Sequence, residues 1–411
     1  MKQALRNLLV ILIIIMFIVA FSSSYASLSI DNLVYVLAIA IDKASTNNLE
    51  VSFQFSTSVN AESSSSKSQT SIINTVSASS ISNAINLVNG YLGKQLNLSH
   101  CKVIIFSEEL ANEGISDEIY TLINDTQVRP SSNIIVSKCD AKYYLEQTKP
   151  ELENLISKYY ELFTNSSEYS GYTPNATIGN FFNNLICKTC EPYAILGGVN
   201  TSSNEQANNS SDNSQKDYLI KANESSIEGK NNAENIGVAV FKGDRIAGEL
   251  NALETISFLN FRNKIKRFLI SVPDPENENS HLDIYVSPSH NVKVNVDTTT
   301  ESPYIKVECN FIARIYSMSE NAKYLSAEVL EDISDSCNSY LESVFSDYLY
   351  KTSKEFEADI NGFGNYALDN FFTSNQYEEY DWLGNYKNAF FDVKVNTSVK
   401  SGMLINETEN N

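Results

Sequence analysis

Residues 33–41 read LVYVLAIAI, a short and almost continuous apolar run that decides the fold class. A run of this length and composition is typical of a β-strand that is buried on both faces of a sheet. Asp42 and Lys43 end it, and residues 49–56 (LEVSFQFS) then alternate apolar and polar side chains. Alternation with a period of two indicates a half-buried strand, so the two segments are predicted to pair as a hairpin.

The rest of the first half alternates strands with helices. Ser79 is predicted to cap a helix whose apolar residues recur every three or four positions. Residues 103–106 and 133–137 are predicted strands, with a helix beginning at Glu108 between them, and the serine-rich residues 61–71 are predicted to form a loop. Such alternation indicates a sheet that is covered by helices.

The second half is predicted to be a sheet packed by one long helix. A hairpin turns at Gly243, since glycine allows the positive φ of a tight turn. Pro273 and Pro275 are predicted to stop a strand, and Gly362–Gly364 to stop the long helix, which carries Ile333, Cys337 and Leu341. The predicted elements are a helix over 252–267, strands over 268–272, 282–286, 292–296, 304–315 and 391–395, and the long helix before the last of these.

A polar stretch divides the chain. Residues 201–235 are dominated by Asn, Ser, Glu and Lys, so burial there cannot offset the entropy lost on ordering. We therefore predict a signal or anchor segment at 1–26, an N-terminal mixed α/β domain at 27–200, a flexible loop or linker at 201–235, and an α+β region at 236–411, with a further division into lobes near 275–290. The fold class is α+β.

The amino terminus predicts export. Lys2 and Arg6 precede an unbroken apolar run over 8–21. This run is shorter than the roughly 20 residues of a spanning helix and matches the apolar region of a signal peptide. Residues 24–26 (SYA) offer small side chains where a signal peptidase reads. Cleavage after Ala26 and retention as an anchor are both open.

The net charge of −20 excludes one class of partner, because nucleic acid phosphates would be repelled. Six cysteines in 411 residues do not make a disulfide scaffold. Cys187 and Cys190 form a single C-x-x-C, without the second pair or spaced histidines of a zinc site. A disulfide or two free thiols is the interpretation there.

No catalytic motif is apparent among the residues. The three histidines, His100, His281 and His290, are not at metal-ligand spacing, and there is no nucleophile elbow or phosphate-binding loop. Glu108 and Glu109 are adjacent carboxylates at a predicted helix start, where they favour the helix dipole. They are the candidates, with His100, for an exported hydrolase, the least favoured function.

Several segments, spread from about residue 30 to about residue 400, form one set of motifs. They are 34–42 (VYVLAIAID), 98–110 (LSHCKVIIFSEEL) with 113–115 after it, 237–250, 358–364 (ADINGFG), and Trp382 with Tyr386. In content and in order these segments resemble the Ger(x)C family, the C subunits of bacterial spore germinant receptors.

The resemblance implies a multi-lobed mixed α/β ectodomain without catalytic, cofactor or metal residues. It implies a subunit that acts with a large membrane A subunit and a transporter-like B subunit at the spore inner membrane, in germination triggered by small nutrients. The matched motifs are interpreted as structural, His100 included. An exported solute-binding or cell-envelope interaction protein is the alternative.

One departure from the family lies near the amino terminus. Family members normally carry a lipobox ending in L-x-G-C, whose cysteine takes a lipid. Residues 20–31 (AFSSSYASLSID) contain no cysteine, so lipidation of that kind is excluded. Attachment to a membrane would then rest on the apolar segment or on partner subunits.

Overall fold

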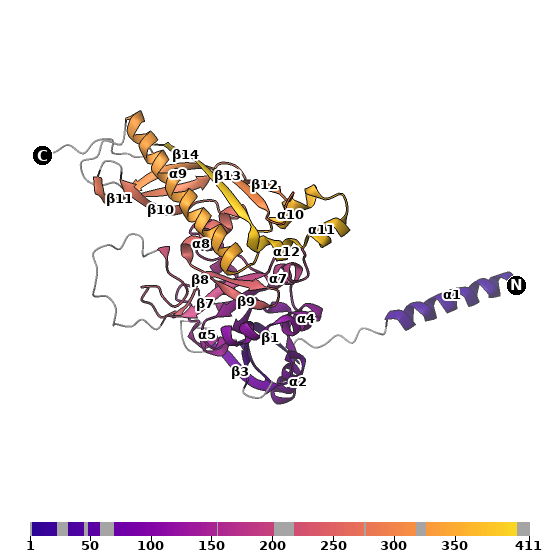
Figure 1. The fold of residues 1–411 in the computed structure, drawn as a ribbon. Helices are drawn as coiled ribbons and strands as arrows, with labels where there is room; N and C mark the ends of the chain where they lie inside the picture. Colours follow the sequence, from indigo (N-terminus) through magenta and orange to yellow (C-terminus); the bar gives the residue numbers. More distant parts are fainter. Residues whose placement is uncertain are drawn as a thin grey trace.

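The computed structural model describes residues 2–22, 32–44, 48–57, 70–153, 155–200, 218–274, 277–317 and 326–400. Two lobes, each built on its own sheet, lie against one another, and helix α1 (Lys2–Ser22) stands apart from both (Figure 1). The predicted cleavage site at 24–26 and most of the predicted loop at 61–71 lie outside the described residues. Mixed α/β lobes with helices packed on sheets confirm the predicted fold class.

The first sheet has a parallel centre and antiparallel margins. Its order is β3-β2-β1-β5-β6-β7-β8-β9, with β4 beside β1, and β1, β5, β6 and β7 run parallel. The predicted hairpin of the first two strands is confirmed, with Ile39 opposite Phe53. The strands are β1 (Leu33–Lys43), β2 (Leu49–Thr57), β3 (Thr70–Ala78), β4 (Gln95–Asn97), β5 (Val103–Ser107), β6 (Asn133–Ser137), β7 (Tyr193–Val199), β8 (Ala233–Lys242) and β9 (Arg245–Leu250).

Helices cover this sheet, so β5, β6 and β7 are buried along their whole length. Helix α5 packs on β1, β5, β6 and β7, while α3 packs on β1, β5, β6 and β9. The cap of α2 is Ser80 and not the predicted Ser79, because the Ser80 side chain accepts from the Asn83 amide. The helices are α2 (Ile81–Leu92), α3 (Glu108–Glu113), α4 (Ser116–Asn124), α5 (Ala141–Gln147), α6 (Ile156–Leu162) and α7 (Ile178–Leu185), with 3-10 turns η2 (Leu98–His100) and η3 (Phe163–Glu168).

The contacts of Asp42 explain why the apolar run of the first strand is followed by an acidic residue. Its buried carboxylate accepts hydrogen bonds from the amides of Ala141, at 2.6 Å, and Lys142, at 2.9 Å. These amides open α5 and have no partner within the helix. Burial raises the pKa of Asp42, and the two hydrogen bonds oppose that shift. The Asp42 carboxylate thus connects β1 to the first turn of α5.

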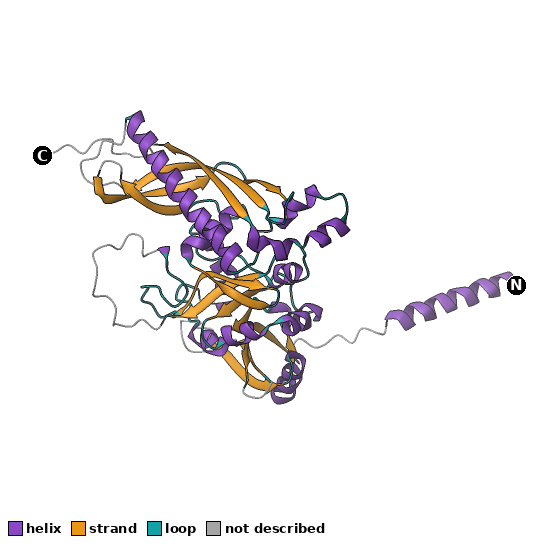
Figure 2. Cartoon of the chain, viewed as in Figure 1, coloured by secondary structure: helices purple, strands orange, loops and turns teal. Residues whose placement is uncertain are grey.

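The second sheet is centred on its longest strand, β13. β11 and β12 pair with one side of β13 and β14 runs parallel on the other, while α9 lies along the sheet (Figure 2). The predicted face of Ile305, Val307, Cys309 and Phe311 is buried. The elements are β10 (Phe268–Asp274), β11 (Asn277–Pro288), β12 (Lys293–Asp297), β13 (Tyr304–Ser317), α9 (Ala327–Tyr350) and β14 (Phe390–Lys400).

Three predicted boundaries in this lobe are wrong. Pro273 lies within β10 opposite His281, which is tolerated because β10 is an edge strand and needs no amide there. Helix α8 (Ala252–Phe261) ends well before residue 267, since Asn263 takes a left-handed φ of 56°. Helix α9 ends at Tyr350 and passes into a π-helical turn, η5 (Lys351–Glu355), before Gly362 is reached.

Short helices complete the second lobe between η5 and β14. They are α10 (Gly364–Ala367), η6 (Leu368–Asn370), α11 (Ser374–Tyr380), α12 (Trp382–Asn385) and η7 (Tyr386–Asn388).

The predicted flexible stretch at 201–235 is corrected in its second part. Residues 201–217 lie outside the described residues, whereas 218–225 and 231–235 contain buried or half-buried residues and hydrogen-bond to the strands beside them. The amide of the buried Ala222 donates to the Ile236 carbonyl at 2.9 Å, and Tyr218 is also buried. Burial of Tyr218 and Ala222 is enough to order this segment, because each of them lies against a sheet that other parts of the chain have formed. β8 begins at Ala233, inside the stretch that was predicted to be flexible, and pairs with β7 in the first sheet. β11 runs unbroken through 277–288, where a division of the lobe was predicted.

Candidate functional site at the junction of the two lobes

The turn at 358–364 (ADINGFG), called the junction turn here, is organised by a buried carboxylate. Asp359 is 0% exposed and accepts hydrogen bonds from the Gly362 amide at 2.8 Å, the Gly364 amide at 2.9 Å and Trp382 Nε1 at 3.0 Å. Gly362 has a φ of 77°, which a side chain would strain. The acidic residue and the glycines of this motif therefore serve a single turn.

Burial raises the pKa of Asp359, and the hydrogen bonds from Gly364, Trp382 and the neighbouring amides act against that shift. Gly362 donates to one oxygen of the carboxylate, and Gly364 and Trp382 donate to the other, so both oxygens act as acceptors. A buried charge is tolerated when donors replace the water it has lost. The turn and its carboxylate thus stabilise each other.

Segments from both lobes converge on the junction turn. From the first lobe, the Glu191 amide donates to the Asp359 carbonyl at 2.9 Å. From the second, Arg262 donates to the Ile360 carbonyl at 2.7 Å, and the Tyr348 hydroxyl donates to Asn361 Oδ1 at 2.9 Å. The turn therefore joins the end of α8, the end of α9 and the loop ahead of β7.

Glu191 links a second family motif to this place. Its side chain is 7% exposed and accepts from the Gly243 amide at 2.7 Å, in the β8–β9 hairpin. Burial raises the pKa of Glu191, and the nearby Asp359 adds to the shift. Gly243 itself has a φ of 61°. Two motifs that are far apart in the sequence thus meet at Glu191, whose carboxylate contacts the hairpin and whose amide contacts the junction turn.

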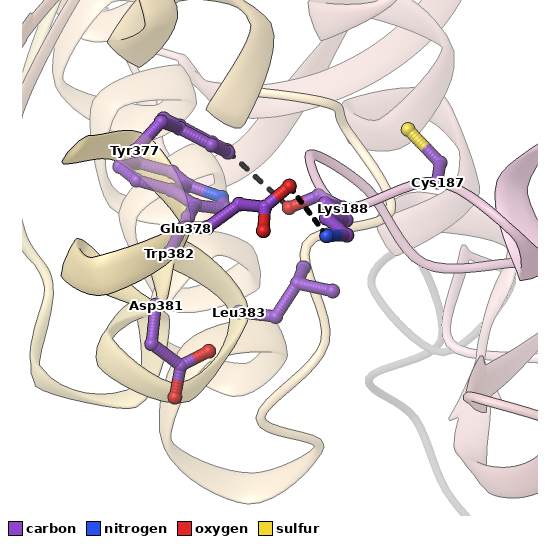
Figure 3. Close-up of a pocket in the computed structure, with 7 residues that line it drawn as sticks. All are labelled: Cys187, Lys188, Tyr377, Glu378, Asp381, Trp382 and Leu383. Atoms are coloured by element: carbon purple, nitrogen blue, oxygen red, sulfur yellow. Dashed lines mark hydrogen bonds and ion pairs between the residues drawn. The ribbon is translucent and has the colours of Figure 1, made fainter. Parts of the chain in front are cut away.

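Beside the turn, a surface pocket of about 340 Å³ lies between the lobes. The ammonium group of Lys188 pairs with Glu378 at 2.6 Å, and the Tyr377 hydroxyl donates to the Lys188 carbonyl at 3.3 Å, while Asp381 points away from them (Figure 3). The remaining lining residues are Cys187, Trp382 and Leu383. The pocket is therefore lined by an ion pair, Lys188 with Glu378, and by the aromatic rings of Tyr377 and Trp382.

The two cysteines of the C-x-x-C lie here as free thiols in different surroundings. Burial acts to raise the pKa of Cys187, but hydrogen bonds from Thr189 and Cys190 outweigh it and leave that pKa below its ordinary value. Burial raises the pKa of Cys190 to about 12. Among the described residues, no group of three or more His, Cys, Asp or Glu is arranged to hold a metal ion.

The hydrolase candidates do not form one site. His100 lies before the start of β5, where its ring packs edge-on against Tyr35 at 4.7 Å between centroids. Glu108 and Glu109 follow the opposite end of the same strand. Glu109 is exposed and pairs with Lys43 at 3.2 Å, while burial and then Glu249 raise the pKa of Glu108.

Sequence reasoning missed the roles of Asp359, Glu191 and Thr189. The signal for Asp359 was present, because an acidic residue followed by two closely spaced glycines indicates a carboxylate that accepts from a turn's amides. Nothing local marks Glu191, because its partners come from a distant hairpin and a distant turn.

Comparison with known proteins places the two halves in one class. Residues 27–196 match the family model described as "Spore germination protein N-terminal domain". Residues 236–402 match the model described as "Spore germination B3/ GerAC like, C-terminal". The chain belongs to the Ger(x)C family of spore germinant-receptor C subunits, which confirms the resemblance seen in the sequence.

A solved structure described as "Crystal Structure of the GerBC protein" is similar to the chain at 14% identity. The match covers 88% of this chain and 96% of that chain, with a TM-score of 0.46. None of the curated proteins compared with the chain matches it. Within the described residues, no helix combines the length and apolar character that crossing a membrane would require.

Proposed function

We propose that the chain is the non-catalytic C subunit of a nutrient germinant receptor, at the outer face of the spore inner membrane. There it contacts the membrane A and B subunits and is needed for germination through these contacts. The observation that carries the proposal is that both halves match family models of spore germination proteins. The roles of Asp42, Gly243 and Asp359 support it, since each of these motif residues makes contacts that build the fold.

Co-purification tests the proposal directly. A tagged chain, solubilised from spore membranes with mild detergent, should bring down the A and B subunits, and deletion of its gene should slow germination with at least one nutrient. A tagged exported protein of another family is the control. Recovery of the chain without either subunit, together with normal germination after removal of its paralogues, would contradict the proposal.

Attachment is tested separately by mass spectrometry of the mature amino terminus combined with membrane fractionation. We propose that attachment depends on the apolar segment or on partner subunits, because residues 20–31 lack the lipid-bearing cysteine. An intact Lys2 in the membrane fraction supports the apolar segment. A chain that begins at Ser27 and leaves the membrane when the A and B subunits are deleted supports the partners.

A second function, exported solute binding, is favoured by one observation. A pocket of about 590 Å³ lies where α8 begins and α9 ends, within the usual size of ligand sites. Lys351 pairs there with Glu254 at 2.8 Å. Calorimetry with amino acids and sugars tests it. Two results together would favour this function over the receptor subunit: a ligand that binds the chain but not its Lys351→Ala variant, and normal germination of spores from which the gene has been deleted.

A further inference from the structure

The loop at 187–191, called the junction loop here, contacts the second lobe through several of its residues. Thr189 Oγ1 donates to Asn365 Oδ1 at 2.9 Å, and the Glu191 amide donates to the Asp359 carbonyl at 2.9 Å. Gly364 packs so closely that a Cβ there would overlap the Thr189 carbonyl oxygen. Any change in the backbone of the junction loop therefore acts on the contact between the lobes.

The sulfur of Cys187 is surrounded by hydrogen-bonding groups of this loop. Thr189 Oγ1 lies 2.9 Å from it and the Thr189 amide donates to it at 3.4 Å. Hydrogen bonding from Cys190 also acts to lower the pKa of Cys187, and the Cys190 thiol itself lies 3.5 Å from Asn184 Oδ1. Donors converging on a sulfur favour its thiolate form, which is the nucleophile in thiol chemistry.

One hydroxyl connects this sulfur to the second lobe. Thr189 has a single hydroxyl proton, yet Asn365 Oδ1 and Cys187 Sγ both lie 2.9 Å from its oxygen. While Cys187 is a thiol, its own proton can be donated to Thr189, which then donates to Asn365. When Cys187 is a thiolate, the sulfur competes with Asn365 for the same proton. The state of the sulfur therefore bears on an inter-lobe hydrogen bond.

We propose that Cys187 and Cys190 are a redox-convertible thiol pair in which Cys187 is the attacking group, and that the bond formed between their sulfurs shifts the backbone of the junction loop and so loosens its contact with the junction turn. The co-reactant is a disulfide, either a small one or that of a thiol–disulfide oxidoreductase. This inference does not depend on the proposed receptor function.

The steps balance as ordinary thiol–disulfide exchange. Cys187 thiolate attacks one sulfur of the oxidant, a mixed disulfide forms, and the first thiolate of the oxidant leaves. Cys190 then loses its proton and attacks the Cys187 sulfur, so the second thiolate leaves. Two electrons pass from the pair to the oxidant, and the two protons released by the cysteines protonate the leaving thiolates.

The other cysteines provide an internal control. Cys101, Cys309 and Cys337 are buried, and burial raises the pKa of each to about 12. Cys139 is half-buried, and burial raises its pKa as well. Cys187 alone among the six has a pKa shifted downward. Selective chemistry at Cys187 is therefore distinguishable from general thiol exposure.

The first test uses the purified full chain without substitutions. Limited iodoacetamide at pH 7.5, followed by peptide mass spectrometry, should label Cys187 at least about tenfold faster than Cys101, Cys309 or Cys337. Oxidised glutathione should then give a Cys187–Cys190 disulfide. Equal labelling of all cysteines, or failure to form that disulfide in excess glutathione disulfide, would overturn the proposal.

The second test separates the attacking thiol from the resolving one and measures the junction. Cys190→Ser should trap glutathione on Cys187, whereas Cys187→Ser should leave Cys190 unmodified. Hydrogen exchange of the Glu191 and Gly364 amides should be about tenfold faster in the oxidised wild type than in the reduced form. Unchanged exchange in a fully oxidised sample would refute the loosening, and this comparison needs no variant to fold.

Discussion

The two sheets use their faces differently. In the first, β5 and β6 are buried at every residue, because helices cover both faces. In the second, alternate residues of β13 such as Ile305 and Val307 are buried, while Lys306 and Arg314 are exposed. The same backbone geometry thus tolerates polar residues at half the positions in one lobe and at almost none in the other. The cost of a substitution should follow that difference.

The largest effect is expected from a charge in the centre of the first sheet. Ile104 is 0% exposed and lies between Ile39 and Ile134 on the neighbouring strands. We expect Ile104→Asp to unfold the first lobe, since an unpaired buried charge costs several kcal/mol. Arg314→Asp, on the open face of β13, should change stability by less than about 0.5 kcal/mol. Equal melting temperatures for the two variants would contradict the difference in burial between the two sheets.

The next effect concerns the junction that both sheets share. Asp359→Ala leaves the amides of Gly362 and Gly364 and the Trp382 ring nitrogen without their acceptor. We expect a loss of about 3 kcal/mol or more, because each buried donor left unsatisfied costs about 1–3 kcal/mol. Urea unfolding measures it, with the exposed Asp369→Ala as the control. A loss below 1 kcal/mol would show that the turn is held by its neighbours and not by its carboxylate.

Two glycines, one in each lobe, give a smaller and opposite pair of effects. A Cβ at Gly364 would overlap the Thr189 carbonyl and approach Trp382 Cδ1 to 2.7 Å, so Gly364→Ala should destabilise by about 1–3 kcal/mol. Gly90, within α2, has open space around its Cβ position. Gly90→Ala should therefore stabilise by about 0.5–1 kcal/mol. Thermal unfolding of the two variants checks the signs, and destabilisation by both would contradict the packing at Gly364.

The smallest effect is a pH dependence at the junction. The pKa of Glu191 is raised in the folded protein by burial and by Asp359. The folded state therefore binds a proton more readily than the unfolded state, whose glutamate has a pKa of about 4.3. Between that value and the raised pKa, the unfolding free energy should fall as pH rises. Glu191→Gln should remove part of this slope while keeping an acceptor for Gly243, and identical pH profiles would contradict it.

Local patterns predicted the strands well and the ends of the helices poorly. The apolar run of β1 and the alternation of β13 are recorded in consecutive residues, so their positions could be predicted. The end of α8 depends on the left-handed Asn263, and the cap of α2 depends on whether Ser79 or Ser80 faces the Asn83 amide. Pro273 could not be placed because the sequence does not reveal which strand forms the edge.

The candidate site was predicted only in its parts. The C-x-x-C, the hairpin at Gly243 and the turn at 358–364 were each recognised as separate features. Their meeting through Glu191 and Asp359 was not, because hydrogen bonds between distant residues leave no periodicity in either segment. The difference between the two thiols was not predicted either. Cys187 and Cys190 are only three residues apart, and their pKa values depend on burial and on nearby donors, which the local sequence does not show.

Consecutive residues therefore carry the fold class, the order of strands and helices, and the motifs of the Ger(x)C family. These properties depend on short-range hydrophobic pattern and turn chemistry, which are complete within a dozen residues. Tertiary packing decided that one turn, held by a buried carboxylate, would join segments of both lobes and that one thiol would be set apart from five others. Burial and donor placement arise only when segments remote in the chain are brought together, and no local pattern specifies them.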